Sequence, residues 1–198
     1  MKISPSISSS NLLNIGDELK KLECNYQDIH IDIEDGNFVP NITFGNRMVM
    51  QIRTATDLPF SVHLMVTNPL DYIYMLSTQK CNVIFIHVEA SMYIMRYVNL
   101  IHKLGMKVGI AFNPITPIES YEYLFDKVDA ILIMTSEPDY AGERFISSML
   151  QKIIDVRNKF GGELWCDGGI DTEMLEKLEK INVDVCVMGR AIFKNKER

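Results

Sequence analysis

The sequence predicts an α/β protein of the (β/α)8 barrel class, because short apolar segments alternate with longer amphipathic segments along the chain. Eight apolar segments are expected as strands, and seven amphipathic segments between them are expected as helices. Strict alternation of this kind produces a parallel sheet with right-handed crossovers. Eight such units favour closure into a barrel, and an open doubly wound sheet is the competing arrangement.

The expected strands are short and consist mostly of β-branched or other apolar residues. Continuous apolar segments of this length are typical of strands that are buried on both faces, as parallel sheets require. The expected strands are residues 2–4, 28–33, 59–64, 83–88, 107–111, 130–134, 163–166 and 184–188.

The expected helices carry apolar residues at spacings of three and four, which places those residues on one face. They are residues 12–22, 46–54, 69–77, 94–104, 118–125, 145–159 and 172–180. Start signals precede three of them, at Asn68-Pro69, Thr116-Pro117 and Asp171-Thr172. Because only residues 189–198 follow the last strand, the final helix is expected to be short or missing.

Length and composition fit one domain over residues 1–198, with 47% hydrophobic and 23% charged residues. A net charge of −6, without a run of Lys or Arg, argues against a nucleic-acid partner. No apolar run is long enough to cross a membrane, and the first residues do not resemble a signal peptide. The four cysteines form no C-x-x-C pair, so we expect a cytoplasmic protein with reduced thiols.

Four metal-ligand side chains occur near the carboxyl ends of expected strands. His30 and Asp32 are two residues apart and share a face, while His63 and Asp167 belong to the third and seventh strands. One such residue is usually a hydrogen-bonded core histidine or a helix-capping aspartate. Four together are costly to bury unless they are paired or bind a metal. Two imidazoles and two carboxylates suit Zn²⁺, Fe²⁺, Mn²⁺ or Co²⁺ alike.

Two glycine-containing segments follow the seventh and eighth expected strands. Gly168 and Gly169 come directly after Asp167, and Gly189-Arg190 follows the last strand. Barrel enzymes often bind phosphate in these two loops, on backbone N–H groups at a helix start. The alternative interpretation is that the glycines only form turns.

Seven segments resemble the motifs of ribulose-5-phosphate 3-epimerases, in the same order, between residues 2 and 193. The segment HIDIEDGNFVPN at 30–41 resembles the signature H-x-D-x-M-D-G-x-F-V-P-N. The other segments are KISPSI at 2–7, VHLM at 62–65, HVEA at 87–90, NPITP at 113–117, DGGI at 167–170 and GRAIF at 189–193.

The resemblance implies a (β/α)8 barrel and an isomerase that inverts C3 of a ketose phosphate. The leading reaction would convert D-ribulose 5-phosphate to D-xylulose 5-phosphate through an enediolate, with Asp32 and Asp167 as the acid/base groups. One divalent ion (Zn, Fe, Mn or Co) would be held by His30, Asp32, His63 and Asp167. The substrate would contact Ser6, His63, Asp139, Tyr140, Ala141, Gly142, Gly168, Gly169, Gly189 and Arg190. The resemblance also implies a homo-oligomer.

Several positions depart from the family pattern. Glu34 replaces Met, Arg190 replaces Ser, and the V-N-P-G-F-G-G loop reads SEPDYAG at 136–142, so that Asp139 and Ala141 replace glycines. The pattern resembles a divergent epimerase-like branch, and Glu34, Met65 and Met134 are candidate specificity residues. Two alternatives therefore stay open: an epimerase for another sugar phosphate such as allulose 6-phosphate, and a barrel that binds a sugar phosphate without turning it over.

Overall fold

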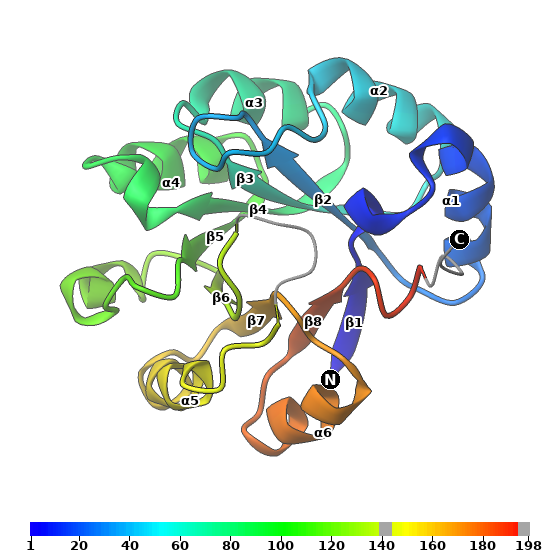
Figure 1. Cartoon of the computed structure of the whole chain (residues 1–198). Coiled ribbons are helices and arrows are strands. Elements are labelled where there is room, and N and C mark those ends of the chain that lie inside the picture. The colour runs from blue at the N-terminus through cyan, green and yellow to red at the C-terminus, as the bar shows by residue number, and fades with distance from the viewer. Residues whose placement is uncertain (139–143, 194–198) are drawn as a thin grey trace.

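The computed structural model describes residues 1–138 and 144–193, and it contains one sheet of eight parallel strands. The strand order is β1-β8-β7-β6-β5-β4-β3-β2, and the sheet curls so that the two strands at the ends of this order, β1 and β2, approach each other (Figure 1). Between β1 and β2 the contact is an isolated parallel bridge that joins Ser6 to His30. The predicted (β/α)8 barrel is confirmed as a nearly closed barrel with helices between the strands.

Each of the eight predicted strands is present, with ends that differ from the expected ends by at most two residues. Most extend one residue further at the carboxyl end, which includes Glu34, Met65 and Asp167 in the sheet. The strands are β1 (Lys2–Pro5), β2 (Ile29–Glu34), β3 (Phe60–Met65), β4 (Cys81–His87), β5 (Lys107–Phe112), β6 (Ala130–Met134), β7 (Glu163–Asp167) and β8 (Val185–Met188).

Six of the expected helical segments contain α-helix. They form α1 (Ile15–Glu23), α2 (Asn46–Ala55), α3 (Leu70–Leu76), α4 (Ile94–Lys103), α5 (Met149–Lys159) and α6 (Thr172–Lys180). Short 3-10 helices accompany them: η1 (Ile7–Ser9), η2 (Leu12–Asn14), η3 (Val88–Ala90) and η4 (Glu119–Leu124). Among the described residues after β8, residues 189–193 form a turn and no helix, as expected for a short or missing final helix.

Three helix predictions were wrong in kind or extent. The helix expected at 145–159 begins only at Met149, because the Ile146 N–H donates to the Thr135 carbonyl outside any helix. The segment 118–125 forms the 3-10 helix η4, in which the Tyr121 ring packs edge-on against Phe112 of β5. The segment 12–22 is interrupted at Asn14, whose φ of −129° and ψ of 33° are not helical. Asparagine side chains form hydrogen bonds with nearby backbone groups in non-helical conformations, and so favour helix ends over helix interiors. In the same segment, the Asn11 side chain caps η2 by accepting from the Leu13 N–H.

Apolar side chains fill both sides of the sheet. The outer layer packs β-strand residues such as Ile29, Ile31 and Ile33 against the helices. The inner layer consists of Val83, Phe85, Ala111, Ala130, Leu132, Met134, Trp165, Val185 and Val187. Because this inner layer fills the barrel, polar groups inside it can be reached only from the mouth at the carboxyl ends of the strands.

Candidate metal centre and active site

The four predicted ligands converge at the carboxyl end of the barrel. His30 and Asp32 come from β2, His63 from β3 and Asp167 from β7, and one ligand atom of each lies within 4.8 Å of the others. The His30 Nε2 atom is 3.3 Å from Asp32 Oδ1 and 3.9 Å from Asp167 Oδ2. The His63 Nδ1 atom is 3.4 Å from Asp32 Oδ1 and 3.5 Å from Asp167 Oδ2.

Strand register produces this convergence. In the β2–β3 ladder Asp32 lies opposite His63, and in the β6–β7 ladder Met134 lies opposite Asp167. His30 and Asp32 point to the same side because side chains alternate along a strand. The alternate residues of β2 are isoleucines that pack under the helices, so the polar set faces the barrel axis.

Three buried atoms at the centre have no hydrogen-bond partner among the described residues. They are His30 Nε2, Asp32 Oδ1 and His63 Nδ1, and all three belong to the converging set. A buried polar atom without a partner costs about 1–3 kcal/mol. A cation held by these atoms would remove that cost, so the donor set fits a divalent metal.

The other oxygen of Asp32 is occupied by hydroxyl donors from the first loop. Ser6 Oγ donates to Asp32 Oδ2 at 2.5 Å, and Ser8 Oγ donates to the same atom at 3.1 Å. Burial opposes ionisation of Asp32, but the charge of His30 and contacts with His30 and His63 hold its pKa well below its usual range. Asp32 is therefore a carboxylate at neutral pH.

His30 is oriented by a serine on the neighbouring strand. Its Nδ1 atom lies 3.0 Å from Ser61 Oγ, and that hydroxyl also lies 3.2 Å from the Ile29 carbonyl, to which it donates. Trp165 and Phe85 pack around the ring at centroid distances of 6.3 and 6.4 Å. With Nδ1 engaged at its outer side, His30 presents Nε2 to the centre.

His63 is surrounded differently, by a second histidine and a carboxylate. Its Nε2 atom lies 2.8 Å from His87 Nε2, and His87 Nδ1 lies 2.9 Å from Glu89 Oε2. Burial opposes protonation of His63, yet the nearby carboxylates of Asp167 and Asp32 raise its pKa to about 9. Burial is the largest influence on His87 and lowers its pKa to about 4, so that ring is neutral.

Glu34 lies two residues after Asp32 on the same face of β2, and its side chain is half-buried at the mouth. Burial, with the Asp32 carboxylate as the next cause, raises the pKa of Glu34 to about 7. Asn41 Nδ2 donates to Glu34 Oε2 at 2.8 Å, and Met65 is its partner in the β2–β3 ladder. The other candidate specificity residue, Met134, is buried at the end of β6.

The loop after β7 has the backbone form that glycine favours. Gly168 and Gly169 have φ values of 117° and 63°. A Cβ atom on Gly168 would lie 2.6 Å from the Ser136 backbone nitrogen, so no other residue fits this close approach. Thr135 Oγ1 donates to the Gly168 carbonyl at 2.5 Å, which fixes this loop to the end of β6.

The turn after β8 packs against the loop that carries Ser6. A Cβ atom on Gly189 would overlap Ser9 Oγ, and Ser6 N–H donates to the Met188 carbonyl at 2.9 Å. Arg190 follows in this turn and is exposed. The other predicted substrate-binding residues, Asp139, Tyr140, Ala141 and Gly142, lie outside the described residues.

Sequence reasoning gave no role to several side chains around the predicted ligands. Ser8, Ser61 and His87 contact a predicted ligand, and Glu89 contacts His87. His87 and Glu89 belong to the segment HVEA that carried the family resemblance, so the signal was present. His63, the partner of His87, is 24 positions away along the chain, and only the fold brings the two histidines into contact.

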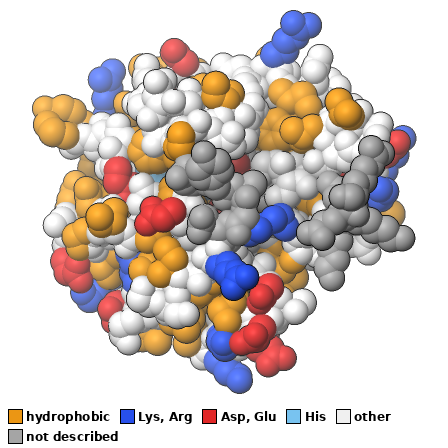
Figure 2. All heavy atoms as spheres, in the orientation of Figure 1, with side chains coloured by type: hydrophobic (Ala, Val, Ile, Leu, Met, Phe, Trp, Pro, Cys, Tyr) orange, Lys and Arg blue, Asp and Glu red, His pale blue; other side chains and the backbone are white. Residues whose placement is uncertain are grey.

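Charged side chains of both signs are spread over the face that Figure 2 shows, and they do not gather into one basic patch. Among the described residues, no helix combines the length and the apolar character needed to span a membrane. All four cysteines are free thiols, and Cys166 and Cys186 are buried, as their apolar strand context predicts.

Solved structures with the same fold include a mutant form of the tryptophan synthase α-subunit of Pyrococcus furiosus. The TM-score is 0.75, with 13% sequence identity, over 98% of this chain and 88% of the other. Identity this low establishes the shared barrel fold alone.

Relatives with higher sequence identity identify the family of the chain as well as its fold. The chain is 36% identical to a ribulose-phosphate 3-epimerase of Bacillus subtilis, over 100% of this chain and 94% of the relative. It is 37% identical to the chloroplastic ribulose-5-phosphate-3-epimerase of Arabidopsis thaliana, over 98% of this chain and 72% of the relative. Residues 2–193 match the family described as the ribulose-phosphate 3 epimerase family. The chain therefore belongs to the ribulose-phosphate 3-epimerase family, and it is an isomerase of the epimerase type that acts on carbohydrates.

Proposed function

We propose that this protein is a metal-dependent epimerase that inverts C3 of a ketose phosphate, with D-ribulose 5-phosphate to D-xylulose 5-phosphate as the leading reaction. One observation carries the proposal: two carboxylates and two imidazoles converge at the barrel mouth, and three of their buried atoms have no hydrogen-bond partner in the part of the chain that the structure describes. Family membership supports the reaction type.

The cation would be held by His30, Asp32, His63 and Asp167. Nitrogen and oxygen donors in equal number suit Zn²⁺, Fe²⁺, Mn²⁺ or Co²⁺. When bound, such an ion supplies Lewis-acid stabilisation of the negative charge that develops on the substrate oxygens.

The two aspartates are suited to move the C3 proton. One carboxylate removes the proton from C3, and the electron pair of the C–H bond moves toward the C2 carbonyl to form an enediolate. The other aspartate, as the acid, returns a proton to the opposite face of C3, so the protonation states of the pair are exchanged after one turnover. Asp32 lies on β2 and Asp167 on β7, two different walls of the mouth. General acid–base catalysis of this kind contributes about 10²–10⁴-fold.

The remaining predicted residues would position the substrate. Ser6 lies beside Asp32, within reach of a substrate hydroxyl at the centre. Backbone groups at Gly168, Gly169 and Gly189 would bind the phosphate, together with Arg190 and residues 139–142. In that arrangement the phosphate lies across the loops after β7 and β8, and the reacting carbons lie over the metal ligands.

The test is a panel of ketose phosphates assayed with metal-stripped and reconstituted protein. We expect turnover of D-ribulose 5-phosphate that chelation abolishes and a divalent ion restores. Glu34 at the mouth favours one alternative, an epimerase for another sugar phosphate, which would show a higher kcat/KM for a substrate such as allulose 6-phosphate. Absence of turnover on every panel member, with binding retained, would instead support a non-catalytic barrel.

A further inference from the structure

We infer that His87 and Glu89 are positioning residues, which hold His63 in the one tautomer that can bind a cation through Nδ1. The inference rests on the proposed function, because it takes the centre to be a metal site. His87 and Glu89 are not themselves among the four ligands.

The three side chains form a continuous hydrogen-bonded chain beside the centre. His63 Nε2 and His87 Nε2 are 2.8 Å apart, and His87 Nδ1 and Glu89 Oε2 are 2.9 Å apart. Both histidines are fully buried, and their ring planes differ by 21° with centroids 4.9 Å apart, as an edge-to-edge hydrogen bond requires. The Phe38 ring packs against His87 at a centroid distance of 4.7 Å.

The positions of the protons follow from the carboxylate. Glu89 can only accept, so the proton of a neutral His87 must lie on Nδ1. His87 then presents a lone pair at Nε2, and the hydrogen bond to His63 requires the proton on His63 Nε2. His63 Nδ1 is then the nitrogen that faces Asp32 and Asp167, and a cation bound there would displace the Nδ1 proton that these carboxylates favour in the metal-free protein.

Glu89 is itself fixed by groups that donate to it. The backbone N–H of Asn113 donates to Glu89 Oε1 at 2.9 Å, and the Thr116 hydroxyl donates to the same oxygen. The sequence predicted Thr116 at a helix start, but its side chain serves this contact instead. Glu89 therefore offers Oε2 alone to His87.

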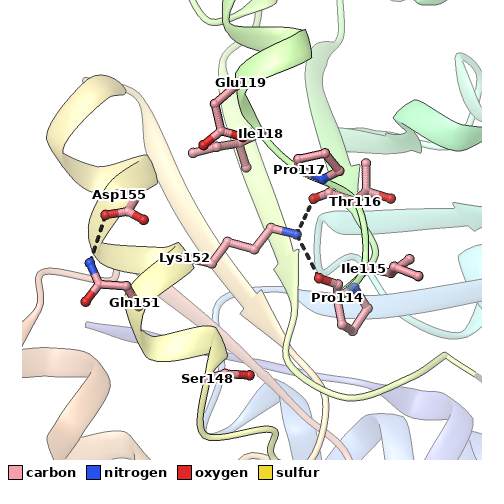
Figure 3. A pocket seen from close by; sticks show the side chains of 10 residues that line it. All are labelled: Pro114, Ile115, Thr116, Pro117, Ile118, Glu119, Ser148, Gln151, Lys152 and Asp155. Atoms are coloured by element: carbon pink, nitrogen blue, oxygen red, sulfur yellow. Dashed lines mark hydrogen bonds between the residues drawn. The ribbon is translucent and has the colours of Figure 1, made fainter.

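The loop that carries these donors is fastened to α5 by Lys152. The Lys152 ammonium donates to the carbonyls of Thr116 at 2.6 Å, Asn113 at 2.8 Å and Pro114 at 3.3 Å. Figure 3 shows the Lys152 side chain reaching from the helix into this loop. Lys152 therefore holds the two residues that donate to Glu89, and Glu89 in turn holds His87 beside His63.

The second imidazole ligand is constrained through a hydroxyl and not through a carboxylate. Ser61 Oγ donates its one proton to the Ile29 carbonyl, so it accepts from His30 Nδ1–H. Of the two imidazole ligands, His63 alone has a neighbour whose proton position is dictated by a carboxylate. Partners of this kind typically change metal affinity by about 10–100-fold.

The Glu89→Gln substitution tests the proton positions directly. The amide oxygen must face the Asn113 and Thr116 donors, so the amide NH₂ faces His87 Nδ1. The His87 proton then moves to Nε2, and the His63 proton moves to Nδ1, where it blocks the ligand atom. We expect affinity for Co²⁺ or Zn²⁺ about 10–100-fold weaker than in the unmodified protein.

Two substitutions of His87 separate proton position from packing. His87→Gln can place an amide oxygen where it accepts from His63 Nε2, so it should retain most of the affinity. His87→Leu offers no acceptor and should lose affinity as Glu89→Gln does. The matched control is His102→Leu, which breaks a histidine–carboxylate pair outside the centre, with Asp129 at 2.9 Å, and should leave affinity unchanged.

The readouts are the metal dissociation constant, from competition with a chelator, the Co²⁺ absorption spectrum and nitrogen-15 NMR of the imidazoles. The chain has only four histidines, which makes the assignment practical. In the unmodified protein His87 should carry its proton on Nδ1, a result that needs no variant. A proton on His87 Nε2, or Glu89→Gln binding as tightly as the unmodified protein, would overturn the inference while the metal site stands. Failure of the unmodified protein to bind any of these ions would overturn the proposed function, and this inference with it.

Discussion

At the scale of single residues, the two carboxylate oxygens of Asp32 have different surroundings. Oδ2 accepts from two serine hydroxyls of the first loop, while Oδ1 is buried at the centre without a partner among the described residues. The serines fix the carboxylate plane, so that Oδ1 points where a cation and the C3 proton would lie.

Ser6→Ala should therefore reduce kcat/KM by about tenfold or more, because a hydrogen bond to a charged group is worth about 1.5–3 kcal/mol. Ser8→Ala is the matched control and should have a smaller effect, since its contact of 3.1 Å is longer than the 2.5 Å contact of Ser6. Steady-state kinetics on the best substrate measure both. A larger loss from Ser8→Ala would show that Ser6 does not orient the carboxylate.

Glu34 makes the stability of the metal-free protein depend on pH. Its pKa is raised from 4.5 to about 7 in the folded state, so the folded protein binds more protons than the unfolded chain between these values. The favourable contribution is complete below the unfolded pKa and is lost as the pH rises through about 7. Compared with the unmodified protein, Glu34→Gln should gain stability between about pH 5 and about pH 8 in urea unfolding. A difference between the two proteins that does not change with pH would contradict this assignment.

The converging His/Asp set could be predicted from sequence because Asp32, His63 and Asp167 lie within two residues of a strand's carboxyl end, and these ends meet at one mouth. His30 joins them because it lies on the same face of β2 as Asp32. The contacts of His87 could not be predicted from sequence, because a motif does not reveal which distant side chain its residues contact. The contacts of Ser8 and Ser61 could not be predicted either, since serine is common at turns and on strands for other reasons.

At the scale of elements, α6 begins where the sequence indicates. The Asp171 side chain accepts from the Met174 N–H at 3.0 Å, as the predicted cap requires. By contrast, η4 was expected as an α-helix from its apolar spacing, and it is a 3-10 helix whose Tyr121 packs on β5. Local capping is encoded within four residues, whereas this packing depends on a partner strand.

Asp171→Ala should lower the free energy of unfolding by about 1 kcal/mol, because it leaves a first-turn N–H without its acceptor. Asp171→Ser is the control, since serine caps helices about as well as aspartate. Thermal or urea unfolding of the two variants measures the difference. Equal stability of Asp171→Ala and the unmodified protein would show that the cap contributes nothing.

At the scale of the whole molecule, the site depends on closure and filling of the barrel. The bridge between Ser6 and His30 joins the first and second strands at the centre itself. Beneath it, Phe85 and Trp165 pack at a centroid distance of 5.0 Å and support His30. The alternation of segments predicted the eight strands, but this bridge and this interior packing are visible only in the folded chain.

Gly109 makes room for that packing, because a Cβ atom there would overlap the Phe85 ring. Gly109→Ala should destabilise the protein by about 1–3 kcal/mol through overpacking and weaken metal affinity by displacing the support of His30. Gly161→Ala is the control, because its Cβ would meet nothing within 4 Å. Unfolding and metal titration of both variants test this, and equal behaviour of the two would contradict it.

Exchange of the C3 proton with solvent deuterium tests the central claim most directly. The metal-reconstituted protein should incorporate deuterium at C3 of D-ribulose 5-phosphate, followed by mass spectrometry or NMR. Asp32→Asn and Asp167→Asn should each abolish incorporation while circular dichroism shows the fold intact. Unchanged incorporation in either variant would contradict the two-aspartate account.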